Sequence, residues 1–310
     1  MIINTGCRTD IPAFYSKWFI NRIKEGYVYV RNPYYPKQIT KYILDPKVVD
    51  CIDFCTKNPE PMLKHLDEIS HFKQFWFITI TPYGKDIEPN VPDKDKVIIS
   101  FQKLSQKLGN NLVGWRYDPI FLNKEFTIEK HIKSFEYIAK KLKGYTNYCT
   151  ISFLDLYEKV KRNAPDLRPP SKEEQIILAK EFVKIGKRNN IEIYSCCEST
   201  FLKEFGINTS GCRNQKLVEK SIGYKLNYPK TNNKRNKCNC LMGNDIGVYD
   251  SCGHLCKYCY ANTNKNNVIQ NMKKHDPASP LLIGNIKNED KVTVANQKSY
   301  KLKQEQITLF

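Results

Sequence analysis

Three cysteines lie on one short segment near the C-terminus, Cys252-Gly-His-Leu-Cys256-Lys-Tyr-Cys259. Three thiolates on one tight loop can hold three corners of an iron–sulfur cube and leave the fourth iron open for a small molecule. A structural zinc ion normally takes four closed ligands, commonly as two separated pairs. The spacing therefore favours an open 4Fe-4S cluster, with a zinc knuckle or a chance grouping of thiols as the alternatives.

The spacing C-x3-C-x2-C, with an aromatic residue (Tyr258) before the last cysteine, resembles the signature of the radical S-adenosylmethionine (SAM) enzymes. In that superfamily the open iron binds SAM, and reductive cleavage of SAM yields a 5′-deoxyadenosyl radical. The resemblance implies a 4Fe-4S cluster on Cys252, Cys256 and Cys259. It also implies SAM as a second cofactor and a reductant such as flavodoxin or ferredoxin.

The elements that must position this loop can be read from alternating patterns along the chain. Short β-branched or aromatic runs end in polar residues, and helical patterns lie between most of them. Eight runs are predicted as strands: Ile2–Thr5, Tyr27–Val30, Val48–Phe54, Phe75–Ile80, Leu112–Trp115, Asn147–Phe153, Ile191–Ser195 and Asp245–Tyr249. The clearest helical patterns are Pro12–Lys24, Pro61–Ser70, Lys94–Leu108, Thr127–Leu142 and Ser171–Asn189.

Strands that alternate with helices indicate an α/β fold with a parallel sheet. Eight such units predict a (β/α)8 TIM-type barrel over residues 1–262, with its chemistry at the carboxyl ends of the strands. A doubly wound open sheet is the alternative. Residues 263–310 are mostly polar and are expected to form one helix and a flexible tail.

The cysteine loop follows the last predicted strand, whereas radical SAM enzymes usually carry it after their first. The resemblance therefore implies a circularly permuted barrel, in which the strand ending at Arg8 follows the cluster strand in space. Permutation is physically plausible because the termini of such a barrel lie close together.

The whole chain also resembles a bacterial family of unknown function. The resemblance runs from Arg8-Thr-Asp-Ile-Pro-Ala-Phe-Tyr15 through Arg116-Tyr-Asp-Pro-Ile120 to Cys259-Tyr-Ala-Asn262. A more distant similarity, in the cluster motif continuing into Cys-Tyr, is to spore photoproduct lyase, a radical SAM enzyme that reverses a thymine photolesion.

Charged residues at the predicted strand ends should converge at the barrel mouth. They are Arg8, Asp10, Arg31, Lys57, Arg116 and Asp118. Their charges suit the carboxylate and ribose of SAM, or a substrate phosphate. The alternative is an internal ion-pair network that seals the barrel. Tyr83 and Tyr249 are candidates for stacking on a base or relaying a hydrogen atom, with burial in the core as the alternative.

Further cysteines in the same third of the chain predict a second metal site. Alternation along Ile191–Glu198 places Cys196 on the polar face of its strand. Four thiolates, from Cys196, Cys212, Cys238 and Cys240, would suit a second iron–sulfur cluster or a zinc ion. Buried thiols that behave as small hydrophobes are the alternative.

Composition indicates what kind of protein this is and in which compartment it works. The 310 residues are 41% hydrophobic and 12% aromatic, as in folded proteins. No apolar run approaches the roughly 20 residues that a membrane span needs, and no secretory signal is evident. We therefore expect a cytoplasmic protein, in which the twelve cysteines are metal ligands or buried thiols rather than disulfides.

Charge and the chain end predict the partner. The net charge of +18 favours a polyanion, with nucleic acid first, although lysine-rich composition is also typical of AT-rich genomes. The terminal Gln306-Ile-Thr-Leu-Phe310 resembles the peptide that docks bacterial DNA polymerases and repair proteins on the sliding clamp. The alternative is that Leu309 and Phe310 pack against the barrel of the same chain.

Together these patterns predict a radical SAM iron–sulfur enzyme that repairs or modifies DNA. One alternative keeps the radical chemistry on RNA, a peptide or a small metabolite. The other is a non-catalytic zinc or iron–sulfur module that binds nucleic acid.

Overall fold

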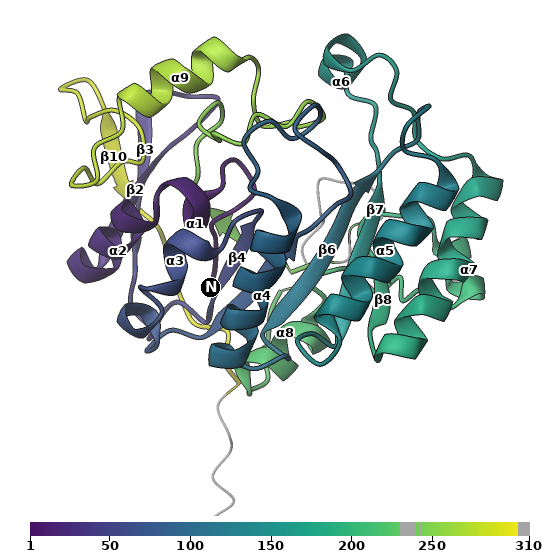
Figure 1. The fold of residues 1–310 in the computed structure, drawn as a ribbon. Coiled ribbons are helices and arrows are strands. Elements are labelled where there is room, and N and C mark those ends of the chain that lie inside the picture. Colours follow the sequence, from purple (N-terminus) through teal and green to yellow (C-terminus); the bar gives the residue numbers. More distant parts are fainter. Residues whose placement is uncertain (230–237, 239, 242, 303–310) are drawn as a thin grey trace, which may run out of the picture.

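The computed structural model describes residues 1–229, 238, 240–241 and 243–302. Its centre is a sheet of seven parallel strands in the order β8-β7-β6-β5-β4-β1-β9 (Figure 1). The strands are β1 (Ile2–Asn4), β4 (Cys51–Thr56), β5 (Gln74–Thr79), β6 (Val113–Ile120), β7 (Tyr148–Phe153), β8 (Glu192–Ser195) and β9 (Asn244–Asp245). From β1 to β8 the order runs in one direction, without the reversal that defines a doubly wound sheet.

Helices cover both faces of this sheet. Figure 1 shows α4, α5 and α7 side by side over one face, while α8 packs against β5 from the other. The α-helices are α1 (Ile11–Phe14), α2 (Ser16–Glu25), α3 (Glu60–Leu63), α4 (Lys94–Leu108), α5 (Ile128–Leu142), α6 (Glu158–Asn163), α7 (Lys172–Asn189), α8 (Gln215–Ile222) and α9 (Lys265–Lys273). Two 3-10 helices occupy Asp67–Ile69 and Thr200–Phe205. We call the face under α8 the inner face.

Local sequence explains where these elements begin. The side chain of Asp93 accepts a hydrogen bond from the Asp95 N–H and caps α4. Ser171 and Glu174 form a reciprocal capping box at the start of α7. In β5, all six residues are buried, as expected for a parallel strand that is covered on both faces.

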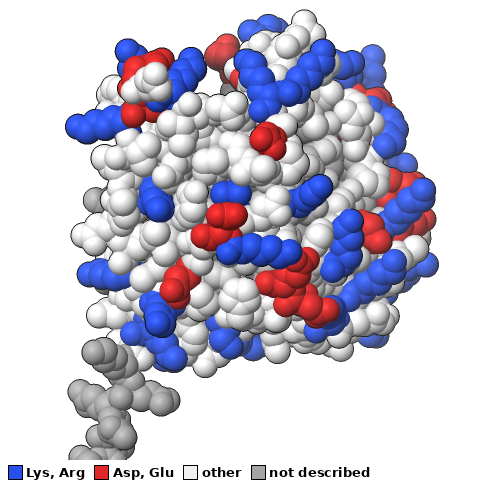
Figure 2. All heavy atoms as spheres, turned by 90° about the vertical axis from the view of Figure 1, so that its left-hand side faces the viewer, with Lys and Arg blue, Asp and Glu red and all other residues white. Residues whose placement is uncertain are grey.

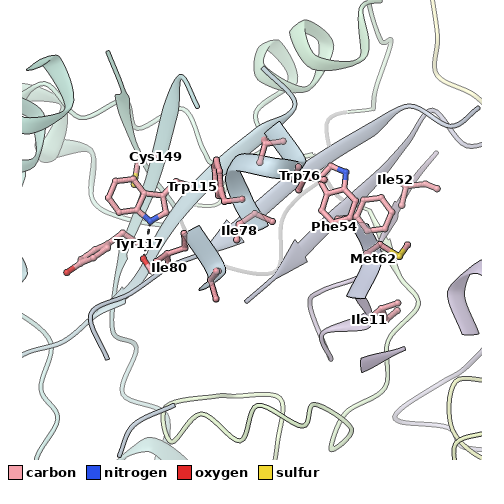
Figure 3. Close-up of a cluster of buried hydrophobic side chains, with 14 of the residues drawn as sticks. Ile11, Ile52, Phe54, Met62, Trp76, Ile78, Ile80, Trp115, Tyr117 and Cys149 are labelled. Atoms are coloured by element: carbon pink, nitrogen blue, oxygen red, sulfur yellow. Dashed lines mark hydrogen bonds between the residues drawn. The ribbon is translucent and has the colours of Figure 1, made fainter. Parts of the chain in front are cut away.

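The main core lies between the sheet and helices α4, α5 and α7, which cover the opposite, outer face (Figure 3). Trp76 stacks on Phe54 with ring centroids 4.0 Å apart, and Trp115 donates its indole N–H to the Ile80 carbonyl at 3.0 Å. The neighbouring residues Phe75 and Phe77 point to the inner face, where they pack with side chains of α8. Strand β5 therefore contributes alternate residues to two apolar layers.

A second sheet of three strands corrects the predicted barrel. It pairs β2 (Tyr27–Arg31) antiparallel with β3 (Gln38–Ile43), which pairs with β10 (Lys291–Val294). The run Tyr27–Val30 is thus a strand, but of this sheet. Among the described residues β8 and β9 do not pair with each other, so the large sheet is open where a closed (β/α)8 barrel was predicted.

The polar C-terminal segment also differs from its prediction in part. The expected helix after the cysteine loop is α9. The loose tail does not hold for residues 291–294, because β10 adds to β3 in register Lys291↔Gln38 through Val294↔Lys41. The terminal peptide Gln306–Phe310 lies outside the described residues.

The first and last strands of the large sheet are neighbours, as the permuted order predicts. β9 pairs parallel with β1 through Ile3↔Asn244 and Asn4↔Asp245. The cysteine loop that follows β9 therefore starts beside the segment that follows β1. In the described part of the chain, no helix has both the length and the apolar character that crossing a membrane requires.

Candidate functional site: a cysteine-lined cavity at the carboxyl ends of the strands

One cavity of about 280 Å³ lies where the carboxyl ends of the parallel strands meet. It is lined by side chains in or just after six strands and by the cysteine loop. They include Cys7 and Asp10 after β1, Cys55 and Lys57 at the end of β4, Arg116 and Asp118 in β6, Ser152 and Asp155 near the end of β7, and Cys196 after β8. Segments that are distant in sequence thus converge because parallel strands present their carboxyl ends at one edge.

The three cysteines of the C-terminal motif all line this cavity. Their loop is stabilised from within: the Cys259 N–H donates to the Cys256 carbonyl at 3.1 Å, and the Asn262 side-chain amide donates to the Cys252 carbonyl at 2.9 Å. Leu255, between the first two cysteines, adopts the left-handed backbone region with φ of 57°. The loop is therefore folded tightly enough to direct three sulfurs into one space.

The segment after β5 holds the loop in place from outside. The Asn90 side-chain amide donates to the Gly253 carbonyl at 2.7 Å, and the Lys257 N–H donates to the Ile87 carbonyl at 3.0 Å. Gly253 is required by packing, since a Cβ there would lie 2.7 Å from the ring of Phe14. These contacts fix the loop to the body of the protein without using any cysteine sulfur.

His254 and Asp10 join the loop to the segment after β1. The buried Nε2 of His254 lies 2.9 Å from Asp10 Oδ2, which also accepts the Lys57 N–H at 2.8 Å. The other carboxylate oxygen of Asp10 caps α1 by accepting the Ala13 N–H at 3.0 Å. Asp10, predicted to contact SAM, lines the cavity and also positions the cysteine loop.

Glu88 is the centre of a buried charge network beneath the loop. Its Oε1 accepts from Lys57 Nζ at 2.8 Å and from Thr81 Oγ1 at 2.9 Å, and it also accepts from the hydroxyl of Tyr258. Lys94 pairs with the other oxygen. Burial alone would raise the pKa of the Glu88 carboxyl, but Lys57 and Lys94 outweigh it and lower that pKa from 4.5 to about 2.

The other predicted charged residues are also ion-paired. Arg116 and Asp118 line the cavity and pair with each other, as the ion-pair alternative predicted. Arg8 pairs with Asp245 at 2.8 Å and is not among the cavity-lining residues. The prediction that Arg31 converges here is wrong, because β2 belongs to the small sheet and Arg31 forms a bidentate pair with Asp290.

Neither tyrosine proposed for stacking or hydrogen relay lines the cavity. Tyr83 is buried, stacks on Phe121 and donates its hydroxyl to the Pro119 carbonyl at 2.7 Å, as the core alternative predicted. Tyr249 is 36% exposed and lies near Arg8. The tyrosines that do line the cavity are Tyr157, Tyr258 and Tyr260.

Sequence patterns missed Arg213, which lines the cavity and pairs with the buried Asp53 of β4. Cys7 and Cys55, which follow or end strands β1 and β4, also line the cavity. A signal for Cys7 was available, since it follows β1 next to Arg8 in a segment already predicted to be functional. No local signal marks Arg213, which reaches the cavity from the loop before α8.

The residues around the cavity suit an iron-containing cofactor that is bound through cysteine thiolates, together with a polar small molecule. Three cysteines on one loop supply the thiolates. Within the described residues, Thr9 Oγ1 and Arg213 Nε are buried without a hydrogen-bond partner, and both residues line the cavity. Buried polar atoms of this kind normally find a partner, so the chain alone does not satisfy all the polar groups around this cavity.

Fold and site together define an α/β protein with an open parallel sheet and a cysteine-lined cavity at its carboxyl edge. The chain belongs to the family described as Domain of unknown function (DUF1848), whose model matches residues 2–261. That match covers the large sheet and the whole cysteine loop. No curated protein and no solved structure matched the chain.

Proposed function

We propose that this protein is a radical SAM enzyme, with Cys252, Cys256 and Cys259 as the ligands of a 4Fe-4S cluster. The observation that carries the proposal is the meeting of all three cysteines in one cavity at the carboxyl ends of the parallel strands. This edge is where α/β proteins of this kind place their chemistry.

Strand order supports the same proposal. Read across the sheet, the order is β9, β1, β4, β5, β6, β7, β8, which is the chain order with the last strand moved to the front. The cysteine loop therefore follows the first strand in space, as it does in the superfamily that the motif resembles. Circular permutation accounts for its position at the end of the sequence.

When bound, the cluster with SAM at its open iron supplies a 5′-deoxyadenosyl radical. The chain's own residues bind and orient the reactants. Arg213 and Thr9 line the cavity and are polar residues beside which the SAM or substrate groups would lie. Asp10, His254 and Asn90 hold the cysteine loop, so that the three sulfurs do not have to be ordered when the cofactor binds.

The test is anaerobic reconstitution with iron and sulfide, followed by incubation with SAM and a reductant. We expect about four irons per chain at this site and release of 5′-deoxyadenosine, measured by chromatography. A protein that takes up iron and sulfide but never cleaves SAM would contradict the enzymatic proposal and favour a non-catalytic cluster.

DNA is the substrate class that we propose, on the basis of the net charge of +18. On the face shown in Figure 2, lysine and arginine are interspersed with acidic side chains rather than gathered in one patch. A nucleotide would have to leave a duplex to enter a cavity of about 280 Å³.

DNA binding should therefore weaken steeply with salt. For roughly four phosphate contacts with a single strand, we expect a loss of about 50-fold in affinity between 50 and 200 mM salt. Fluorescence anisotropy with a labelled single strand measures this. Absent or salt-insensitive binding would instead favour a peptide or a small metabolite as substrate.

A further inference from the structure

A second group of cysteines lies on the inner face of the large sheet. The sulfurs of Cys196, Cys212 and Cys240 all lie within 4.8 Å of one another, and all three residues are buried. Cys212 Sγ is 3.4 Å from Cys196 Sγ and 3.3 Å from Cys240 Sγ. Across the described part of the chain, no other three cysteine, histidine or acidic side chains bring their ligand atoms this close.

The short sulfur–sulfur distances distinguish a site for a single metal ion from a site for an iron–sulfur cube. Zinc–sulfur bonds of about 2.3 Å in tetrahedral geometry place two thiolates about 3.8 Å apart. In an iron–sulfur cube each thiolate binds a different iron, so the sulfurs must stand much farther apart. The observed distances of 3.4 and 3.3 Å are slightly shorter than this spacing and far shorter than a cube requires, so they favour a single metal ion. Cys252, Cys256 and Cys259 do not form such a tight group, as expected for ligands of a cube.

A fourth thiolate is available from the same short segment as Cys240. Cys238 lies two residues before Cys240 and forms side-chain hydrogen bonds with Cys240 and Cys197. Structural zinc sites take four closed ligands and commonly draw two from one short segment. Cys238 lies outside the group of three but contacts Cys240, so it is the candidate for the fourth ligand. Cys197, whose Sγ is 4.0 Å from that of Cys196, is the competing ligand.

Hydrogen-bond donors surround the sulfurs of this group. Arg116 donates from Nη1 to Cys212 Sγ at 3.4 Å, and the Arg213 N–H donates to Cys240 Sγ at 3.4 Å. Four thiolates around a divalent ion leave two negative charges in a buried site. A guanidinium and a backbone N–H directed at the sulfurs stabilise that charge, as outer-shell partners do in metal sites.

The position of the group in the fold indicates what the ion would do. Cys196 directly follows β8, and Cys240 shortly precedes β9, so the group links the two edge strands of the open sheet. These edges share no ladder of hydrogen bonds in the described residues. We propose that Cys196, Cys212, Cys238 and Cys240 bind one zinc ion, which joins the two edges of the sheet where strand pairing does not.

Metal content tests the site independently of the iron–sulfur cluster. We would compare the full chain with a variant in which Cys252, Cys256 and Cys259 are all alanine, and measure zinc and iron by mass spectrometry. We expect one zinc per chain in both proteins and no iron in the variant. Iron and sulfide that persist in the variant, or the absence of metal from both proteins, would overturn the proposal.

Single variants then assign the ligands. Cys212→Ser and Cys238→Ser should each lower zinc content at least fivefold. Cys51→Ser, which changes a buried thiol of the same apolar layer, should retain it. Retention of zinc in Cys238→Ser together with its loss in Cys197→Ser would overturn the choice of the fourth ligand.

Cobalt substitution and hydrogen exchange complete the test without relying on the stability of a variant. Co²⁺ incorporated into the wild-type chain should show the intense ligand-field absorption of tetrahedral thiolate coordination, whereas weak octahedral bands would overturn the four-thiolate assignment. Chelation of the zinc should raise amide exchange in β8 and β9 more than in β5. Uniform exchange across the sheet would contradict the joining role.

Discussion

Replacing Cys256 with alanine is expected to abolish SAM cleavage while leaving the fold intact. Cys256 lines the cavity, whereas the hydrogen bonds that hold its loop come from Asn90, Asn262 and backbone groups. Loss of outer-shell partners alone costs metal sites about 10- to 100-fold. Loss of one of three thiolate ligands should therefore lower the cleavage rate by more than about 100-fold.

Cys51→Ala is the matched control for that variant. Cys51 is a buried thiol of β4 that does not line the cavity. We expect it to bind as much iron as the wild type and to cleave SAM at the same rate. If Cys256→Ala also assembles the same cluster and cleaves SAM normally, the assignment of the ligands is wrong.

Replacing Glu88 with glutamine should lower the free energy of unfolding more than any other substitution proposed for this protein. The change removes the charge that pairs with Lys57 and Lys94 in the interior. The lowering of the Glu88 pKa from 4.5 to about 2 corresponds to about 3 kcal/mol of folding free energy at neutral pH. Removing one partner of a buried ion pair typically lowers the free energy of unfolding by about 3–5 kcal/mol. Urea unfolding at pH 7 measures the difference.

The pH dependence of this loss has a defined sign. Because the pKa of Glu88 is lower in the folded state, its contribution is fully present above the ordinary value of 4.5 and is lost as the pH falls towards 2. The difference between wild type and Glu88→Gln should shrink to less than half at pH 3. Glu68→Gln, which alters an exposed pair with Lys24, should have a much smaller effect at either pH. Equal stability of Glu88→Gln and wild type at pH 7 would contradict the network's role.

Much of the fold could be predicted because its elements are marked locally. The helical pattern Lys94–Leu108 coincides with α4, where Asp93 marks the start and Gly109 the end. Seven of the eight predicted strands belong to the large sheet. The eighth, Tyr27–Val30, belongs to the small sheet instead. Its alternation predicts a strand, yet nothing local states that its partner is β3 rather than the main sheet.

The candidate site could likewise be predicted from the sequence only in part. The spacing of Cys252, Cys256 and Cys259 is a local signal, and the structure brings all three to the cavity. Glu88 and Arg213 gain their importance only from partners that the fold supplies, namely Lys57 with Lys94, and Asp53. Each is an ordinary charged residue in the sequence, so no pattern could have singled it out.

The most direct test of the central claim is electron paramagnetic resonance of the reduced, reconstituted protein with and without SAM. If three cysteines leave one iron open, SAM will bind that iron and change the spectrum of the reduced cluster. We predict a changed signal in the wild type and in Cys51→Ala. An iron–sulfur signal that is identical with and without SAM would contradict the proposal that this cavity binds SAM at an open iron.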